Sequence, residues 1–316
     1  MGYKAKTWFL AVIAVILIAV FLFISIGSSW DYILPRRAAK VFAILLTGGS
    51  IAFATTVFQT ITNNRILTPS ILGLDSLYLM IQTIVVFLFG SKTLTMGSSN
   101  LNFVVSVGLM ILFSGVLYKV IFKREQQNIY FLLLIGLIFG TLFQSMATFM
   151  QVLIDPNEFQ IVQDKMFASF NNIKTDLLGI AGISVLLVSA YFRKFIKYLD
   201  VLSLGREQAI NLGVDYDYVV KRLLIVVAIL ISVSTALVGP ITFLGLLVVN
   251  VTYEFFKTYR HQYLLPGSIL VSIVALVGGQ LIVERVFTFA TTLSVIINFC
   301  GGGYFLYLLL KENKSW

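Results

Sequence analysis

Residues 202–217 read LSLGREQAINLGVDYD, a polar stretch between two long apolar segments. Arg206, Glu207 and Asn211 alternate with apolar residues at helical spacing, and Gly213 follows where such a helix would end. The pattern predicts a short amphipathic helix in a chain where polar residues are scarce. Two interpretations stay open from the pattern alone. The helix is a solvated connector, or it is the contact through which a separate motor protein moves a membrane bundle.

The composition around this stretch is that of an integral membrane protein. Of the 316 residues, 59% are hydrophobic and 12% are charged, whereas soluble domains carry roughly 25% charged residues. A buried core has no room for so much apolar surface. The net charge of +9 is distributed in short basic patches between apolar runs, which is a pattern of membrane topology. Nucleic acid is therefore excluded as a partner.

Apolar runs of roughly 17–25 residues predict an all-α, polytopic protein with about ten membrane-spanning helices. Residues 1–316 form one transmembrane domain, because no segment between the spans is long enough for a soluble domain. The predicted spans are Trp8–Ile26, Lys40–Thr60, Pro69–Gly90, Leu101–Ile121, Ile129–Met150, Leu177–Tyr191, Val219–Val238, Ile241–Phe256, Leu264–Ile282 and Thr291–Leu310. The first span exceeds the usual apolar core of a signal peptide, about 7–15 residues, so we predict an uncleaved helix rather than a cleaved leader.

The distribution of basic residues favours both termini in the cytoplasm. With that orientation, 16 of the 23 Lys and Arg residues lie on the inner side and 7 on the outer side. The outer seven are Arg36, Arg37, Lys40, Lys92, Lys165, Lys174 and Arg285. The amphipathic stretch 202–217 then faces the cytoplasm.

Three outer arginines, Arg36, Arg37 and Arg285, lie where topology favours few cations. One interpretation, which the pattern favours, is that they anchor helix ends by snorkelling to the interface. The other is that they receive acidic side chains of an extracellular partner.

Polar side chains gather in the fifth predicted span. Gln144, Thr148 and Gln151 fall at helical i, i+4, i+7 spacing, and Ser145 lies beside them. Hydrogen bonding between helices and the wall of a hydrated path explain this stripe equally well. By contrast, Asp75, Glu254 and Glu284 lie near predicted span ends within reach of water. The lack of ionisable groups near the membrane centre disfavours a proton- or sodium-coupled carrier.

No catalytic site, metal site or cofactor is predicted. The chain has no Gly-rich phosphate loop ending in Lys-Ser or Lys-Thr, so ATP hydrolysis belongs to another protein. One histidine, His261, which we interpret as solvated or at headgroup level, excludes a His-cluster metal site. The single Cys300 excludes an internal disulfide and is interpreted as a buried, small apolar residue. An enzyme that acts on lipids within the membrane would need a cluster of His, Cys or paired carboxylates, which is missing.

Four blocks of sequence occur in order along the chain. The first block is Pro35-Arg36, Gln59, Asn64, Pro69 and Leu72-Gly73. The second is Ser203-Leu204-Gly205, Ala209 and Leu212-Gly213. The third is Gly239, Ile241, Phe243 and Gly245-Leu246, and the fourth is Phe305-Leu306-Tyr307-Leu308-Leu309. Together they make the whole chain resemble the permease subunits of bacterial iron–siderophore and cobalamin importers, the FecCD-like family of ABC transporters.

The chain also departs from the blocks of that family. Ile33 and Arg65 replace an Arg and a Pro of the first block, and Gly303 replaces a Pro before the fourth. Asn250 and Tyr253 stand where the family usually has a His and an Arg. The blocks that carry these departures are similar to those of the family branch that handles catecholate or petrobactin-like siderophores.

The resemblance implies a permease in the bacterial cytoplasmic membrane that imports a ferric siderophore. Cytoplasmic ATP-binding subunits would hydrolyse the ATP that drives import. A second permease subunit would complete a homodimer or heterodimer. The coupling helix for the ATPase would comprise Ser203, Leu204, Gly205, Arg206, Glu207, Ala209, Leu212 and Gly213. A permease for cobalamin or haem on the same scaffold, or a cation-coupled secondary transporter, is the alternative.

The resemblance also assigns residues outside the coupling helix. Arg36 and Arg285 would dock an extracytoplasmic substrate-binding lipoprotein, with Arg37 in place of the cation lost at Ile33. The stripe residues Gln144, Ser145 and Thr148 would line the translocation path.

Overall fold

The computed structural model describes residues 2–24, 30–90, 99–121, 129–171, 173, 175–289 and 291–312. Throughout this part of the chain the regular elements are helices, as predicted. They are α1 (Tyr3–Phe23), α2 (Trp30–Thr62), η1 (Pro69–Leu72), α3 (Leu74–Phe89), α5 (Ser99–Ile121), α6 (Ile129–Leu153), α7 (Pro156–Met166), α8 (Thr175–Phe192), α9 (Ile196–Leu202), α10 (Arg206–Asn211), α11 (Tyr216–Val238), α12 (Leu244–Phe256), α13 (His261–Arg285) and α14 (Leu293–Glu312). Lys92 and Lys174, which entered the topology count, lie outside the described residues, as does the end of the first predicted span.

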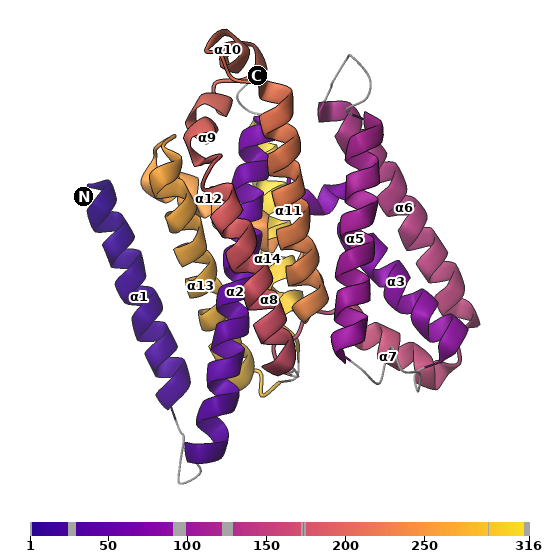
Figure 1. The fold of residues 1–316 in the computed structure, drawn as a ribbon. Helices are drawn as coiled ribbons and strands as arrows, with labels where there is room; N and C mark the ends of the chain where they lie inside the picture. Colours follow the sequence, from indigo (N-terminus) through magenta and orange to yellow (C-terminus); the bar gives the residue numbers. More distant parts are fainter. Residues whose placement is uncertain are drawn as a thin grey trace.

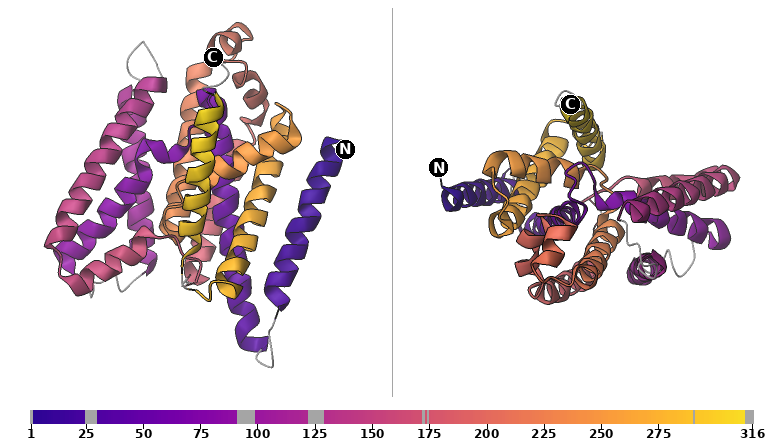
Figure 2. Two further views of the ribbon diagram at one scale, coloured as in Figure 1. Left: turned by 180° about the vertical axis from the view of Figure 1, so that it is seen from behind. Right: turned by 90° about the horizontal axis from the view of Figure 1, so that it is seen from above.

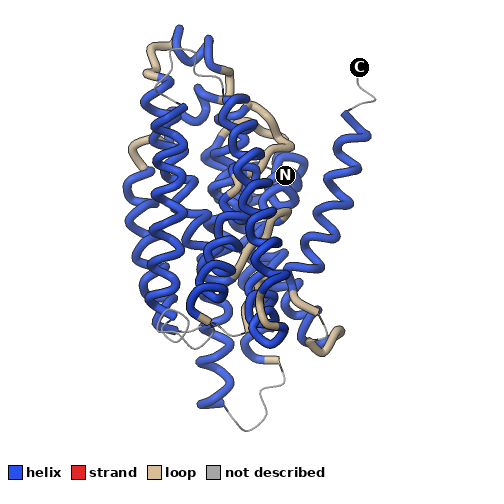
Figure 3. Tube along the Cα trace, turned by 90° about the vertical axis from the view of Figure 1, so that its right-hand side faces the viewer, coloured by secondary structure: helices blue, strands red, loops and turns tan. Residues whose placement is uncertain are grey.

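Seven of the described helices are long and apolar enough to cross a membrane: α1, α2, α5, α6, α8, α11 and α13. Three shorter apolar helices, α3, α12 and α14, lie in the same bundle. The long helices run along one common axis, and loops gather at the two ends (Figure 3). The chain is thus a multi-pass helical membrane protein. That α3, α12 and α14 also cross the bilayer, which would make ten spans, stays a prediction.

Helix α2 forms the centre of the bundle (Figures 1 and 2). It packs against α8, α11, α12 and α13. Its buried face is rich in Ala, Thr, Ser and Gly, and such small residues let helices approach closely in a membrane. Gly48 illustrates this packing, because a Cβ there would lie 2.6 Å from Leu276 Cδ1 on α13. Helix α1 lies at the edge, against α13.

Helices α3, α5, α6 and α7 form a lobe beside this centre (Figure 1, right). The short helix η1 crosses to the lobe at mid-height, so that the third predicted span is not one helix from Pro69. Gly73 ends η1 with φ 78°, and a Cβ there would lie 2.9 Å from Gly140 Cα on α6. A Cβ on Gly136, one turn earlier in α6, would lie 2.9 Å from Leu72 Cα. Glycine on both sides is therefore what allows η1 to cross α6.

The turn before η1 is held by side chains of two of the sequence blocks. Gln59 Nε2 and Asn250 Nδ2 both donate to the carbonyl oxygen of Arg65, at 2.7 and 2.9 Å. Asn64 Oδ1 accepts from the Ile66 N–H at 2.9 Å. Asn250, one of the departures from the family blocks, thereby joins α12 to the loop after α2.

The amphipathic stretch forms the predicted short helix, α10, which projects from one end of the bundle (Figures 1 and 2). Gly213 follows it with φ 79°, and its N–H donates to Ile210 O at 2.9 Å. Asp215 then caps α11 by accepting from the Tyr218 N–H at 3.1 Å. Helix α1 begins and α14 ends at this same end of the bundle.

Candidate functional site

The projecting segment that contains α10, residues 203–213, exposes apolar side chains. Ala209 is buried against the bundle, whereas Leu204, Ile210 and Leu212 are 56%, 47% and 62% exposed. Exposed apolar side chains grouped on a projecting, polar-rimmed element are typical of a contact with another protein. Glu207 is also exposed on this helix.

Arg206 fixes α10 over the start of α11. Its Nη2 lies 3.7 Å from Asp217 Oδ1, and its guanidinium lies 5.7 Å from the ring centre of Tyr216. An exposed pair of this kind contributes about 0–1 kcal/mol, so it orients the helix more than it stabilises the fold.

The helix before α10 is joined to the membrane bundle through His261. Asp200 Oδ1, on α9, lies 2.6 Å from His261 Nδ1 and accepts from the His261 N–H at 2.8 Å. The other ring nitrogen, Nε2, lies 2.7 Å from Thr60 Oγ1 on α2. His261 is 2% exposed, so its interpretation as a solvated residue is wrong. The Asp200–His261–Thr60 chain connects α9, α13 and α2.

Cys300 also departs from its prediction. It is exposed on α14, whereas a buried position was expected. The neighbouring Gly301 makes the close contact instead, because a Cβ there would lie 2.5 Å from Phe243 Cβ. On α14, Gly301 therefore lies on the face that packs against the bundle, and Cys300 does not.

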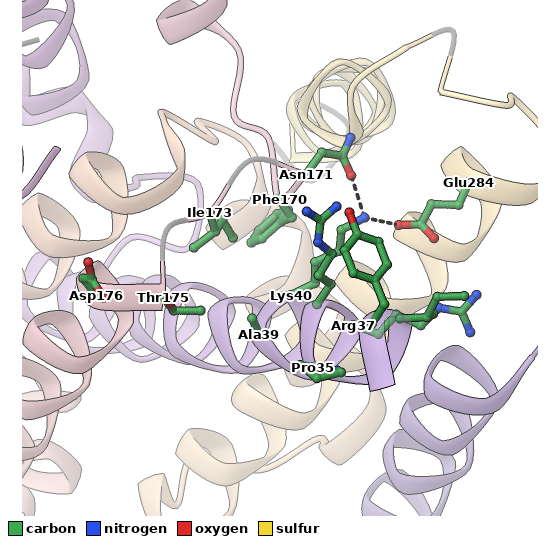
Figure 4. Close-up of a pocket in the computed structure, with 13 residues that line it drawn as sticks. Pro35, Arg37, Ala39, Lys40, Phe170, Asn171, Ile173, Thr175, Asp176 and Glu284 are labelled. Atoms are coloured by element: carbon green, nitrogen blue, oxygen red, sulfur yellow. Dashed lines mark hydrogen bonds and ion pairs between the residues drawn. The ribbon is translucent and has the colours of Figure 1, made fainter. Parts of the chain in front are cut away.

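At the opposite end of the bundle an open pocket of about 750 Å³ lies between α2, Glu284 and the residues Phe170, Asn171, Ile173, Thr175 and Asp176. Lys40 Nζ lies 2.8 Å from Glu284 Oε1 and donates to Asn171 Oδ1 at 3.0 Å (Figure 4). Gln280 Nε2 donates to both Glu284 Oε1 and Asn171 Oδ1. Glu284 is near a helix end as predicted, but it is paired with Lys40 and its side chain is only 11% exposed.

The three outer arginines differ in their contacts. Arg37 Nη1 donates to the carbonyl oxygens of Phe21, Leu22 and Ile24, at 3.2, 3.0 and 2.6 Å. Arg285 Nη2 donates to Ile24 O at 3.2 Å. Both guanidiniums therefore lie at the C-terminus of α1, where the carbonyl groups carry partial negative charge. Arg36 is exposed and stacks on the ring of Tyr32 at 4.2 Å.

A groove of about 500 Å³ separates the lobe from the central helices. Gln144 and Ser145 line it, together with Ser70, Thr141 and Thr242. Apolar side chains, among them those of Phe243 and Phe305, complete its walls. Its lining is a mixture of hydroxyl, amide and apolar groups, with no charged side chain among the described residues.

The rest of the polar stripe does not line this groove. Thr148 is exposed farther along α6, and its Oγ1 donates to Gln144 O at 2.9 Å. Gln151 Nε2 donates to Thr83 Oγ1 on α3 at 3.2 Å. Two residues thus line the groove and one makes a hydrogen bond between helices, and the role of the first two as the wall of a hydrated path stays a prediction.

Asp75 is half-buried beside η1, in the first turn of α3. Its Oδ1 accepts from Thr235 Oγ1 on α11 at 3.2 Å, and its Oδ2 is buried. The reason is that η1 carries the chain inward before α3 begins, so the start of α3 is not at the end of a span. Pro69, the first residue of η1, and Gly73, which follows it, were the sequence signals of this break.

The apolar spans define a polytopic membrane protein, with a groove beside its central helices and a helix, α10, that projects from one end. The fold matches that of a solved chain described as an inward-facing metal-chelate type ABC transporter, with a TM-score of 0.81 and 21% identity, over 98% of this chain and 100% of that one. The chain belongs to the FecCD transport family, whose profile matches residues 9–311.

Two relatives show how closely the chain follows this family. The petrobactin import system permease protein YclO of Bacillus subtilis is 67% identical over 316 residues, which is 100% of both chains. The petrobactin import system permease protein FatC of Bacillus anthracis is 36% identical over 287 residues, 91% of this chain and 81% of that one.

Proposed function

We propose that this chain is the membrane permease subunit of an ATP-driven importer for a ferric siderophore of the petrobactin kind. The observation that carries the proposal is the 67% identity to YclO over the full length of both chains. The groove supports it, because an uncharged wall of hydroxyl, amide and apolar groups suits a bulky chelate that must be released again.

The proposed coupling helix is the segment from Ser203 to Gly213, with α10 at its centre. In this proposal it faces the cytoplasm, as do both termini, and docks into a groove of an ATP-binding subunit. The exposed apolar side chains of Leu204, Ile210 and Leu212 provide the contact area. Arg206 and Glu207 provide charges at its rim.

The other proposed partners meet the outer pocket and the groove. Arg36, exposed beside the outer pocket, receives an acidic side chain of the substrate-binding lipoprotein. Arg37 and Arg285 contribute less, because they donate to the carbonyl groups of α1. A second permease subunit, identical or different, covers the open side of the groove. In this proposal Gln144 and Ser145 face the translocation path at the groove, and Thr148 faces it farther along α6.

Uptake of radiolabelled iron tests the function directly. In cells that lack their own petrobactin permeases, the chain with its ATPase, binding protein and partner permease should restore uptake of ferric petrobactin. Cobalamin and haem serve as competing substrates. Equal restoration of cobalamin uptake would contradict the siderophore assignment. Loss of uptake when ion gradients collapse, with ATP kept constant, would favour a secondary carrier instead.

Substituting Ala for both Arg206 and Glu207 should weaken coupling to the ATPase. Two exposed rim contacts of about 0.5–1 kcal/mol each correspond to about tenfold weaker docking. Substrate-stimulated ATPase activity and iron uptake should fall together in reconstituted vesicles. Lys221→Ala, which removes an exposed charge from the same end but outside α10, is the control. Wild-type rates in the double variant would show that these two side chains do not transmit the coupling.

A further inference from the structure

A small cavity lies behind the wall of the groove, between α2, α3, α11 and α12. Its volume is about 10 Å³, which is the space of one water-sized particle. Oxygen-bearing side chains predominate among its polar lining residues, which are Thr55, Thr68, Ser70, Asp75, Thr235 and Thr242. No basic side chain lines it among the described residues.

Two oxygen atoms of residues that line this cavity have no partner. Asp75 Oδ2 and Thr55 Oγ1 are both buried without a hydrogen bond to any described residue. Thr55 is 1% exposed. The other carboxylate oxygen, Asp75 Oδ1, accepts from Thr235 Oγ1, and the Ser70 side chain lies beside the same carboxyl group. The Asp75 carboxyl group is thus partly enclosed by the bundle, and an ionised carboxylate there is costly unless a cation or a bound proton neutralises it.

The backbone around the cavity is interrupted on two sides. Helix α3 begins at Leu74, so Asp75 lies in its first turn, where the helix dipole favours an ionised carboxylate over a neutral acid. Helix α12 begins at Leu244, and a Cβ on Gly245 would collide with Thr55 Oγ1. Thr68, which precedes η1, and Ile241, in the non-helical segment before α12, also line the cavity. Interrupted helices of this kind supply backbone carbonyl groups that coordinate ions inside membrane proteins.

We propose that Asp75, Thr55 and the hydroxyl groups beside them bind one monovalent alkali cation of about the size of sodium. A water molecule would give Thr55 Oγ1 a partner but would leave the charge of Asp75 uncompensated. A magnesium ion keeps several of its own waters, for which the cavity has no room. One negative charge and a single-particle volume therefore match a monovalent ion.

The position of the site gives the ion a structural consequence. Ser70 and Thr242 line both this cavity and the open groove, so the ion lies directly behind the groove wall. It joins the starts of α3 and α12 to α2 and α11. Binding of the ion in this cavity should therefore stabilise the fold, whether or not the substrate or the ATPase is present.

Thermal unfolding of the purified full-length chain in lipid nanodiscs tests the proposal without any transport measurement. Melting temperatures are compared in NaCl, KCl, LiCl and choline chloride at equal ionic strength. At a sodium concentration ten times the Kd, the melting temperature should exceed that in choline by about 3 °C. The difference should grow with the logarithm of the sodium concentration.

Three variants decide which atoms hold the ion. Asp75→Asn should abolish the difference in melting temperature between sodium and choline. Thr55→Val should lower the affinity for sodium severalfold. Thr56→Val is the matched control on the same helix. The Thr56 hydroxyl bonds Ala52 O and Ser268 Oγ, so this variant should lower the melting temperature yet keep the sodium effect.

Two results would overturn the proposal. Equal melting temperatures of the wild-type chain in all four salts would exclude the ion. A full sodium effect in both Asp75→Asn and Thr55→Val would place the ion elsewhere and leave a proton on Asp75. Because the readout is stability of the isolated chain, either result leaves the proposed transport function unaffected.

Discussion

Substituting Ala for Gly73 should disrupt the close packing of η1 against α6, and transport should be abolished as a result. The added Cβ would lie 2.9 Å from both Cα and N of Gly140, and both are backbone atoms that have no alternative rotamer. The backbone of Gly73 also has a φ of 78°, which an L-residue adopts with strain. Strain and overpacking together predict a loss of about 3–5 kcal/mol of unfolding free energy.

The measurement is unfolding in denaturing detergent, together with the yield of monodisperse protein. Gly108→Ala on α5 is the matched control, because a Cβ there meets nothing within 4 Å. That variant should unfold within about 0.5 kcal/mol of the wild type. If Gly73→Ala were as stable as Gly108→Ala, η1 and α6 could not be in close backbone contact.

The second large effect is expected at His261. His261→Ala removes one partner of Thr60 Oγ1, which still donates to Thr56 O, and one partner of Asp200, which keeps the His261 N–H. A lost hydrogen bond costs about 0.5–1.5 kcal/mol, and the cavity left by the buried imidazole ring adds to this cost. We therefore expect a loss of about 2–4 kcal/mol in unfolding free energy. Helix α9 leads into α10, the proposed coupling helix. If α9 is held less firmly, we expect iron transport to fall more than ATPase activity does.

Two partial replacements separate the two contacts of His261. Asn in this position places a polar group near Nδ1 and should keep the contact with Asp200, whereas Gln reaches toward Thr60. Each should recover part of the lost stability. Gln262→Ala, at the exposed neighbouring position, is the control and should change stability by less than about 0.5 kcal/mol. Wild-type stability of His261→Ala would mean that the chain of hydrogen bonds does not hold α9 in place.

The features that depend on local pattern could be predicted from the sequence. Apolar runs mark most helices within a few residues, because unpaired backbone groups leave no alternative to helix in a bilayer. The helix α10 and its terminal glycine follow from spacing and from the conformational freedom of Gly213. Neither prediction needs knowledge of what packs against the segment.

The features that depend on tertiary packing could not be predicted from the sequence. Asp200 and Thr60 lie 61 and 201 residues from His261, and nothing in the sequence pairs them. Asp75 is half-buried beside η1, and hydropathy does not reveal an interrupted helix when both halves are apolar. The contacts of Arg37 depend on where α1 ends, which its own sequence neighbourhood does not define.

The attachment of α1 has a consequence for how this protein is made. Its main contact is α13, and the guanidinium of Arg285 at the far end of α13 donates to the carbonyl oxygen of Ile24, just after α1. The ribosome must add more than 200 residues after α1 before α13 emerges, on the order of tens of seconds at ~5–20 residues per second. During that interval α1 has α2 beside it, through the contacts of Arg37, but lacks its main neighbour. Its hydropathy is the highest of the seven long helices, and it is the least buried, as suits a segment that waits for its neighbour.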